Sequence, residues 1–200
     1  MNYLMFDGKK YRLVAEEDQC CEAVQEGVRL ADIAVGNTCE IGGREYIVCE
    51  HTSEGTVLLM KELLCDEVEF GQNNNYNGSN VDNLCNEFAE ELEKVVGTEN
   101  IVLHMVDLTA DDGLKDYGFI ERRVSLFTAN QYRKYCDILE NHRVKTWTWT
   151  ATAYSTYKHD DNIWIKCVSP HGGISNGSDD GGNGVRPFLI LKSSIFVSQN

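Results

Sequence analysis

Apolar residues recur at every second position over much of the chain, a pattern typical of antiparallel β-strands. Between residues 38 and 60 the pattern occurs in three successive runs, separated by Gly42-Gly43 and by Ser53-Glu54-Gly55. Glycine-containing turns of this kind favour a tight reversal of the chain. We therefore predict a three-stranded antiparallel meander, with strands at residues 38–41, 45–49 and 56–60.

The first 35 residues have a different pattern. Asp7-Gly8 lies between two short apolar runs, which is the usual signal of a hairpin. Apolar residues within 21–31 share helical spacing and predict a short helix. We expect residues 1–35 to form a hairpin and helix lead-in, and residues 36–200 to form the main domain.

Two further segments have the three-to-four-residue spacing of amphipathic helices. The first covers residues 81–96 and is capped by Ser79 or Asn80. The second begins after Thr128, a good capping residue, and ends near His142. The predicted buried stripe of the first helix consists of Val81, Leu84, Cys85, Phe88, Leu92, Val95 and Val96.

Shorter apolar runs predict strands at residues 101–104, 124–127, 147–152, 163–168 and 185–191. By contrast, residues 171–183 are mostly Gly, Ser, Asn and Asp. Such a segment cannot bury enough apolar surface to fix itself, so we predict a loop held by the strands on either side. The fold class is therefore α+β, with antiparallel strands, two main helices and a loop-rich C-terminal third.

Three tryptophans and one arginine have predicted structural roles. Trp147 and Trp149 stand two apart in a strand and therefore share a face. We interpret these two and Trp164 as a core cluster, with a ligand-stacking platform as the alternative. Arg186 is flanked by apolar residues, so a buried guanidinium there needs a carboxylate or carbonyl partner. We expect Arg186 to lock the return of the preceding loop.

A tract of four asparagines precedes the first helix. Their amides can contact a ligand, yet asparagine is favoured in turns and helix caps. We interpret them as turn and cap residues, namely Asn73, Asn74, Asn75 and Asn77.

The chain carries 32 acidic and 18 basic residues, a formal net charge of −14. This charge attracts cations and basic surfaces and repels the phosphate backbone of nucleic acids, so we predict no direct nucleic-acid partner. A hydrophobic content of 42% is too high for a disordered chain. We interpret the acidic surface as solubilising, with a functional acidic face as the alternative.

Eight cysteines occur, and none has the C-x-x-C spacing of zinc sites or redox motifs. We expect mostly reduced thiols, several of them buried, and no metal site. The sequence begins MNYLMFDGKK, without the apolar core of a signal peptide, and no run approaches the roughly 20 residues that span a bilayer. The expected location is cytoplasmic or virion-associated, without membrane contact. The cysteines are Cys20, Cys21, Cys39, Cys49, Cys65, Cys85, Cys136 and Cys167.

The sequence contains no nucleophile motif, no paired zinc-ligand motif and no glycine-rich phosphate loop. Asp179 and Asp180 lack the ordered spacing of a calcium loop. We therefore predict a protein that is not an enzyme and needs no cofactor. The five histidines are scattered, at His51, His104, His142, His159 and His171.

Several segments, taken in order, carry a resemblance to a known family. The chain over residues 35–198 resembles a family of domains from phages and gut bacteria that is related to the C-type-lectin-like fold. Formylglycine-generating enzymes and the variable proteins of diversity-generating retroelements use the same fold. The segments are Val35–Tyr46, Asn74–Asn80, Ser125–Thr128, Trp149–Ser155 and Gly184–Phe188.

The resemblance implies where a ligand would bind. In retroelement variable proteins, adenine-directed mutagenesis yields Ser, Gly, Asp, His, Tyr or Ile on a ligand-binding face, and residues 154–162 and 171–183 contain nearly this set. The implied contact residues are Tyr154, Tyr157, His159, Asp161, His171, Ile174, Ser175, Asn176, Ser178, Asp179, Asp180 and Asn183.

Other relatives imply functions for which this sequence lacks the residues. Formylglycine-generating enzymes bind copper through a cysteine pair, whereas only Cys167 lies near the equivalent region here. The Glu-Pro-Asn and Trp-Asn-Asp motifs of calcium-dependent sugar lectins are absent.

We therefore expect a ligand-binding display domain, encoded by a phage or prophage, that presents variable-type loops to a protein or cell-surface ligand. The alternative is an acidic phage-encoded inhibitor that occupies a basic nucleic-acid-binding site on a host protein. An oxidase-like enzyme is a third hypothesis. The sequence leaves the oligomeric state open.

Overall fold

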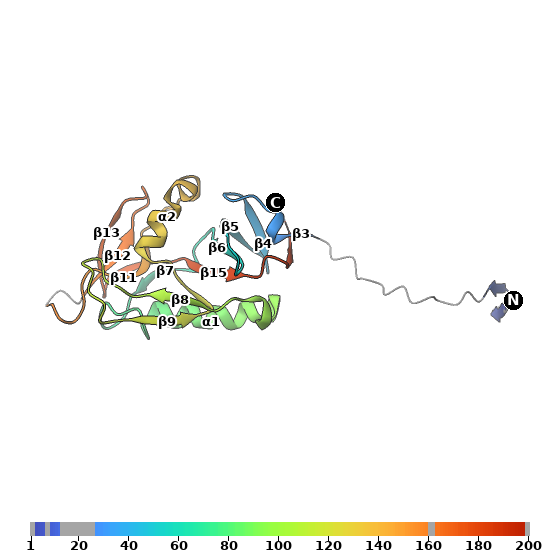
Figure 1. Cartoon of the computed structure of the whole chain (residues 1–200), viewed down its shortest axis with the longest axis horizontal. Helices are drawn as coiled ribbons and strands as arrows, with labels where there is room; N and C mark the ends of the chain where they lie inside the picture. The colour runs from blue at the N-terminus through green and yellow to red at the C-terminus, as the bar shows by residue number, and fades with distance from the viewer. Residues whose placement is uncertain (1–2, 7–8, 13–26, 160–162, 199–200) are drawn as a thin grey trace.

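The computed structural model describes residues 3–6, 9–12, 27–159 and 163–198. Strands predominate and two α-helices accompany them, so the fold class is α+β, as predicted (Figure 1). The helices are α1 (Asn80–Val96) and α2 (Ala129–Leu139). The strands are β1 (Tyr3–Phe6), β2 (Lys9–Arg12), β3 (Val28–Arg29), β4 (Thr38–Ile41), β5 (Arg44–His51), β6 (Thr56–Met60), β7 (Cys65–Glu69), β8 (His104–Asp107), β9 (Phe119–Arg122), β10 (Val124–Leu126), β11 (Thr148–Ala153), β12 (Trp164–Val168), β13 (Ile174–Ser178), β14 (Gly182–Val185), β15 (Pro187–Leu191) and β16 (Phe196–Val197).

The first large sheet has the order β10-β15-β6-β5-β4, and every neighbouring pair is antiparallel. It contains the predicted meander, which is confirmed as β4, β5 and β6. Tyr46 of β5 lies opposite Met60 of β6, and Phe188 of β15 lies opposite Leu59 on the other side of β6. The strand β15 thus lies beside the meander, between β6 and β10.

Both faces of this first sheet are covered. Tyr46 and Leu58 face the larger core, which also holds the buried stripe of α1. Ile47 and Leu59, one position along each strand, face the second core together with Tyr132 of α2. The two helices accordingly lie on opposite sides of the sheet (Figure 1). This explains why β6 is buried at all five positions and does not alternate.

The second large sheet has the order β13-β12-β11-β14-β7. Only β11 and β14 run parallel, and the other pairs are antiparallel. The register of β11 against β12 shifts between Trp149 and Ala153. Within that bulge, the amide of Ala151 donates to the carbonyl of Phe127, 3.0 Å away, directly after β10. The bulge of β11 therefore joins the second sheet to the first.

The prediction of a loop at 171–183 is wrong for most of its length. Residues 174–178 form β13, which pairs with β12 at five consecutive positions, and residues 182–185 form β14. The Gly-rich backbone gains its hydrogen bonds from β12, β11 and β7, partners that composition cannot reveal. Only short turns remain at each end of β13.

Both predicted helices are confirmed, together with their caps. The hydroxyl of Ser79 accepts a hydrogen bond from the amide of Asp82, and Thr128 forms a capping box with Gln131. One position of the predicted stripe is wrong, because Val95 in the last turn of α1 is 56% exposed. Leu84 is only partly buried.

Of the two elements predicted in the first 35 residues, the hairpin is confirmed and the helix is wrong for its described part. The hairpin is confirmed, since β1 and β2 pair antiparallel with Phe6 opposite Lys9. The helix predicted over 21–31 is wrong for its described part, because residues 28–29 form β3 and Leu30–Asp32 form a 3₁₀ turn. Residues 13–26 lie outside the described part. β3 pairs with β16, and Leu30 is buried in the larger core.

The strand predicted at 101–104 is displaced. His104 begins β8, which pairs with β9, and Ile101 makes only a single bridge to Leu191 of β15. Leu103 is 53% exposed, so the apolar run does not mark a buried strand. The chain passes from one sheet edge to another within these residues.

The prediction for the tryptophans is correct only for Trp149. Its ring is 1% exposed and lies edge-on to Phe70 at 5.4 Å, and its indole N–H donates to the carbonyl of Val68 at 2.7 Å. Trp147 is 39% exposed and Trp164 is 37% exposed. Trp147 precedes β11, and Trp164 projects from the face of β12 opposite to the buried Ile165.

Arg186 has the structural role predicted for it. It is 5% exposed, and its guanidinium donates to the carbonyls of Met60, Lys61 and His142 at 2.8, 2.9 and 2.9 Å. Burial lowers the pKa of Arg186 to about 10. These three hydrogen bonds fasten the junction between β14 and β15 to the end of β6 and to the segment after α2.

Six cysteines lie in the described part of the chain, and all are free thiols. Four of these are buried, as predicted, namely Cys39, Cys49, Cys85 and Cys167. Neither described helix is long and apolar enough to cross a membrane.

Candidate ligand-binding surface

Four chain segments lie side by side at one end of the second sheet. The amide of Tyr154 donates to the carbonyl of Trp164 at 2.9 Å. On one side of this pair, the amide of Asp112 donates to the carbonyl of Tyr154 at 3.3 Å. On the other side, the amide of Asp179 donates to the carbonyl of Ile163 at 2.9 Å. With neighbouring strands about 4.8 Å apart, the row from Asp112 to Asp179 is roughly 14 Å wide.

The buried side chain of Asn74 holds two of these four segments in place through hydrogen bonds. The side chain is fully buried, and its amide nitrogen donates to the carbonyls of Ser155 and Trp164 at 2.9 and 3.0 Å. Its amide oxygen accepts from the hydroxyl of Tyr117 at 2.7 Å. One side chain therefore connects the segment before α1, the segment after β8 and both ends of the β11–β12 connection.

The interpretation of the asparagine tract is thus wrong for Asn74 and correct for Asn73 and Asn75, whereas the side-chain oxygen of Asn77 accepts from Nη2 of Arg122 at 2.9 Å. The side-chain oxygen of Asn73 accepts from the amide of Asn75, and that of Asn75 accepts from the amide of Asn77, at 2.9 and 3.1 Å. These are local turn contacts. Nothing in a run of similar residues marks the one whose side chain enters the core.

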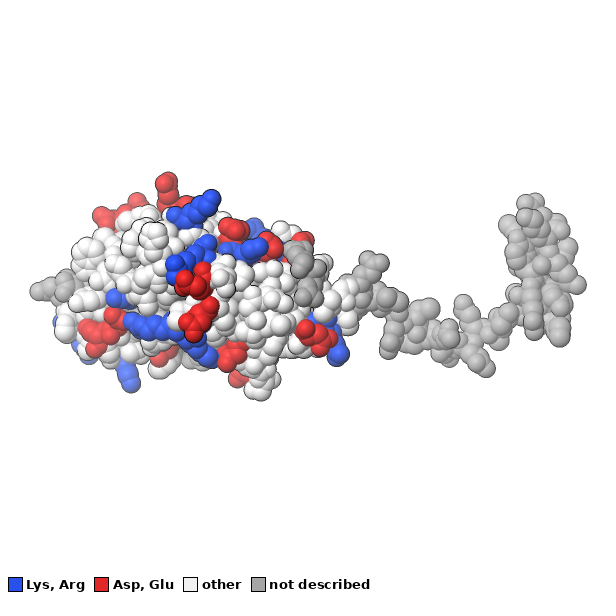
Figure 2. All heavy atoms as spheres, turned by 90° about the horizontal axis from the view of Figure 1, so that it is seen from above, with Lys and Arg blue, Asp and Glu red and all other residues white. Residues whose placement is uncertain are grey.

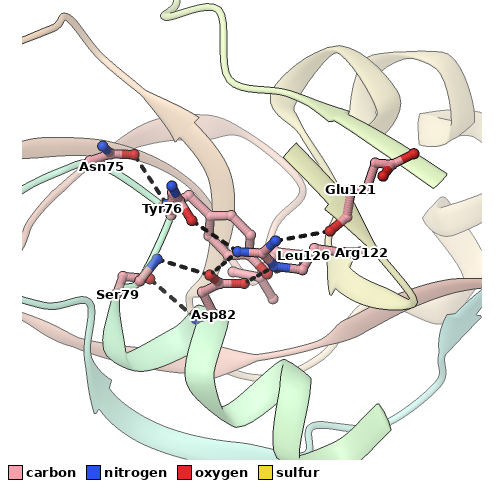
Figure 3. Close-up of polar contacts among 9 residues, drawn as sticks. Asn75, Tyr76, Ser79, Asp82, Glu121, Arg122 and Leu126 are labelled. Carbon is pink, nitrogen blue, oxygen red and sulfur yellow. Dashed lines mark hydrogen bonds and ion pairs between the residues drawn. The ribbon is translucent and has the colours of Figure 1, made fainter. Parts of the chain in front are cut away.

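The segment that carries Asn74 is itself held by a buried ion pair (Figure 3). Arg122 of β9 donates from Nε to Oδ1 of Asp82 at 2.8 Å and from Nη2 to Oδ2 at 2.7 Å. The hydroxyl of Tyr76 accepts from the amide of Leu126 at 3.1 Å. Because Asp82 is only 1% exposed and Tyr76 is equally buried, the segment from 71 to 82 is firmly attached to β9 and β10.

A second charged network supports Tyr154. Lys166 of β12 is 9% exposed, and its ammonium lies 3.2 Å from Oδ2 of Asp111 and 5.7 Å from the centre of the Tyr154 ring. Arg133 of α2 reaches Oδ1 of Asp111 at 2.9 Å. Partial burial alone would raise the pKa of Asp111, but hydrogen bonds from Arg133 and Lys166 outweigh burial and lower it. The carboxylate therefore stays charged and holds both cations in place.

The hydroxyl groups after Tyr154 are also engaged. Ser155 donates to Oδ2 of Asp112 at 2.6 Å, and Thr156 donates to Oδ2 of Asp116 at 2.9 Å. The hydrogen bond from Ser155 lowers the pKa of Asp112. These contacts tie the start of the β11–β12 connection to residues 109–118.

Large apolar side chains are exposed above this framework. Tyr154, Tyr157, Ile163 and Trp164 are 38%, 62%, 42% and 37% exposed. The Tyr157 ring packs against that of Tyr117, with ring centres 6.0 Å apart. We call the four exposed residues the aromatic surface.

The sheet explains why this surface is uncovered. Trp164, Lys166 and Val168 lie on one face of β12, and α2 covers only the end at Val168, which packs in the second core. Ser178 lies opposite Trp164 in the register of β13. The end that carries Trp164 and Ser178 extends beyond α2, at the far end of the molecule from β4 (Figure 1).

The structure brings together half of the ligand residues implied by the resemblance. Those at the aromatic surface are Tyr154, Tyr157, His159, Ser178, Asp179 and Asp180.

The other implied residues lie elsewhere. His171 lies in the turn at the other end of β13, beside Gly172, whose carbonyl accepts from the hydroxyl of Tyr132 at 2.7 Å. Ile174 packs against the second core, and Ser175 and Asn176 occupy opposite faces of β13. Asn183 lies in β14 opposite Val68, and Asp161 lies outside the described residues.

Sequence reasoning missed two members of the aromatic surface. The sequence pattern predicts Trp164 in the core and Ile163 as an ordinary strand residue, whereas both side chains are exposed. An alternating pattern gives the two faces of a strand but not which face a helix will cover. The signal that was present is the position of both residues directly after the polar segment 154–162.

A groove of about 560 Å³ lies at the other end of the molecule. Its lining comes from the β4–β5 turn, the last turn of α1 and residues 194–198, and includes the exposed Val95 and Phe196. Glu40 is the one ionisable side chain in this lining. The groove therefore offers a mostly polar lining that contains one carboxylate.

Among the described residues, no group of three or more His, Cys, Asp or Glu side chains is arranged to hold a metal ion. Comparison with protein-family models, curated proteins and solved structures finds no match to the chain. The assignment to a C-type-lectin-like family therefore stays a prediction.

Proposed function

We propose that this chain is a binding domain that contacts a protein ligand through the aromatic surface and the adjoining turn at residues 178–180. The observation that carries this proposal is the exposure of Tyr154, Tyr157, Ile163 and Trp164 together at one end of a sheet. Exposed apolar side chains grouped at one place on a protein mark interaction sites, and tyrosine and tryptophan dominate the energetics of such sites.

The framework under the surface favours binding. Asn74 and the ion pairs of Asp111 fix the backbone and the Tyr154 ring before any ligand arrives. A preorganised surface loses little conformational entropy on association. Tyr and Trp side chains, which have few rotatable bonds, suit this role, and Ser178 adds an adaptable polar contact.

The finer fold and the biological setting are part of the same proposal. We propose a C-type-lectin-like fold and a phage or prophage origin. The support is the resemblance of five segments in order between residues 35 and 198, together with the α+β class. A near-copy of codons 150–187, differing at adenines and lying beside a reverse transcriptase gene, would support diversification. A gene neighbourhood without these features would contradict diversification by a retroelement, but it would not contradict the proposal that the aromatic surface binds a protein ligand.

The charge pattern on the face seen in Figure 2 does not favour an inhibitor of a basic nucleic-acid-binding site. On the face seen in Figure 2, Lys and Arg side chains are interspersed among Asp and Glu. A surface that imitates a phosphate backbone would present carboxylates in an unbroken row. We therefore advance the aromatic surface as the binding site.

Selection from a library of displayed random peptides tests the proposal. Peptides are selected on the native chain and then measured against two single variants, Trp164→Ser and Trp147→Ser. The two tryptophans have nearly equal exposure, 37% and 39%, and lie at opposite ends of the β11–β12 pair, so Trp147 is a matched control. We expect binding to fall at least tenfold in Trp164→Ser, about 1.4 kcal/mol, and to persist in Trp147→Ser. Ligands that bind both variants equally well, or an unenriched library, would refute the proposal.

A further inference from the structure

We infer that the partner of the aromatic surface is a cationic protein segment, one that places Lys or Arg side chains on both sides of an apolar contact. This inference rests on the proposed function and names the chemistry of the ligand.

Carboxylates flank the aromatic surface on both sides. Asp112 adjoins Tyr154, and Asp179 and Asp180 adjoin Ile163 across the end of β13. Among the residues that the structure describes, these three carboxylates form no ion pair with Lys or Arg. Their contacts are with hydroxyl and backbone amide groups: Ser155 and the amide of Leu114 donate to Asp112 at 2.6 and 3.0 Å, and Ser178 donates to Asp180 at 2.6 Å.

The contrast with two nearby carboxylates is informative. Asp111 is paired with Lys166 and Arg133, and Asp116 is paired with Lys158. These cations belong to the framework and neutralise its own charges. The charge that remains at the rim of the aromatic surface is therefore negative, and it is available to a ligand.

Exposed aromatic rings add attraction for the same kind of group. A Lys or Arg cation is attracted to the face of Trp or Tyr, and tryptophan is the strongest partner. The structure already contains one such contact within the chain, between Lys166 and the ring of Tyr154. Trp164 stands next to Tyr154 in the row, with Asp112 on one side and Asp179 on the other. A ligand cation that reaches the carboxylate on either side therefore passes close to an aromatic ring.

The dimensions fit an extended segment. Side chains on one face of an extended chain repeat about every 6.7 Å, so residues i and i+4 are about 13 Å apart. That separation is close to the roughly 14 Å between Asp112 and Asp179. Cations at i and i+4 then lie over the two acidic edges, and residue i+2 lies over Tyr154 and Trp164.

The charge of the whole chain acts in the same direction. A net charge of −14 steers cationic partners toward the domain, and it repels acidic ones. Nucleic acid would meet this repulsion at the surface and at long range, so a basic protein segment is the better fit.

The peptides recovered with the native chain provide the test. We expect the peptides that depend on Trp164 to be enriched in Lys and Arg at positions four apart. A synthetic copy of such a peptide is then compared with a copy in which citrulline replaces each Arg and acetyl-lysine replaces each Lys. The neutral copy should bind at least tenfold more weakly, and the charged copy should weaken as salt rises from 50 to 300 mM.

Variants of the chain provide an independent arm. Asp112→Asn, Asp179→Asn and Asp180→Asn combined should weaken the charged peptide about tenfold, which corresponds to about 1.4 kcal/mol. Glu87→Gln, Glu90→Gln and Asp137→Asn combined change the net charge equally on exposed helix positions and should leave binding within twofold. If the triple Asp-to-Asn variant has a lower melting temperature than the native chain, peptide binding is measured with Asp180→Asn alone. The salt titration of the native chain then provides the second measurement.

The outcomes separate this inference from the proposed function. Peptides that need Trp164 but lack Lys and Arg, or that bind equally well as neutral copies, would overturn the cationic partner and leave the binding surface intact. An absence of any peptide that distinguishes Trp164→Ser from Trp147→Ser would instead overturn the proposed function.

Discussion

The side-chain amide of Asn74 donates a hydrogen bond to the backbone carbonyl of Trp164, 3.0 Å away and 90 residues further along the chain. The same nitrogen donates to the carbonyl of Ser155, so both ends of the β11–β12 connection are bound to one buried side chain. This contact positions the exposed ring of Trp164 without touching it. The proposed binding surface therefore depends on a residue that is itself fully buried.

Replacement of Asn74 should destabilise the fold. Asn74→Ala leaves the Ser155 carbonyl and the Tyr117 hydroxyl without this buried partner, whereas the Trp164 carbonyl keeps its bond from the amide of Tyr154. Each unsatisfied group costs about 1–3 kcal/mol. We expect a loss of about 2–4 kcal/mol in the free energy of unfolding, measured with urea. Asn73→Ala, at an exposed position that contacts only Asn75, should lose less than about 1 kcal/mol. Equal losses in the two variants would show that Asn74 is an ordinary turn residue.

Two consecutive arginines provide a matched test of the buried ion pair. Arg122→Met removes the bidentate partner of the buried Asp82, and an uncompensated buried charge costs about 3–5 kcal/mol. Arg123→Met removes the ion pair with Glu93, and the side chain of Arg123 is 42% exposed. Exposed pairs of this kind contribute less than about 1 kcal/mol to the free energy of unfolding. Chemical denaturation should show this difference. A mild effect of Arg122→Met would mean that water reaches Asp82.

Acid should weaken the fold through His104. Burial lowers the pKa of this imidazole from 6.5 to about 4, while its Nε2 lies 2.9 Å from the hydroxyl of Ser125. The unfolded chain takes up a proton as the pH falls below 6.5, whereas the folded chain resists until about 4. Stability from this group is therefore fully present above pH 6.5 and is lost as the pH falls toward 4, by about 3 kcal/mol in all.

The variant His104→Gln isolates this contribution from that of the carboxylates. Unfolding free energies measured between pH 7 and 4.5 should fall more steeply for the native chain than for His104→Gln. Parallel curves for the two proteins would assign the acid sensitivity to other groups.

The buried thiols should resist alkylation. Burial raises the pKa of Cys39, Cys49 and Cys85 to about 12, so almost no reactive thiolate forms at pH 8. Cys136 on α2 is exposed. Iodoacetamide labelling followed by peptide mass spectrometry should modify Cys136 within minutes and the three buried thiols only after unfolding. Rapid native labelling of Cys85 would show that α1 opens readily.

The meander and both helices were predictable because local signals agreed with the final packing. Gly42-Gly43 marks the turn between β4 and β5, and the caps Ser79 and Thr128 start the helices where the periodicity begins. These signals lie within a few residues of the element that they define. Sequence reasoning succeeds where the determining contacts are local.

The site was less predictable because its determinants are distant in sequence. Residues 174–178 form a strand only because β12 offers a complete row of partners. Trp164 is exposed because α2 stops short of it, and Asn74 is buried because three separate segments converge on it. The resemblance to variable proteins implies contact residues at this end of the sheet, such as Tyr154, and it also includes His171 at the opposite end of β13.

The most direct test of the account is hydrogen–deuterium exchange of the native chain with and without a selected peptide. We predict protection of amides at 109–116, 153–159, 163–166 and 177–181, the segments that form and adjoin the aromatic surface. The groove lined by residues 95–100 and 194–198 should exchange at the same rate in both states. Protection centred on that groove, with the aromatic surface unchanged, would contradict the account.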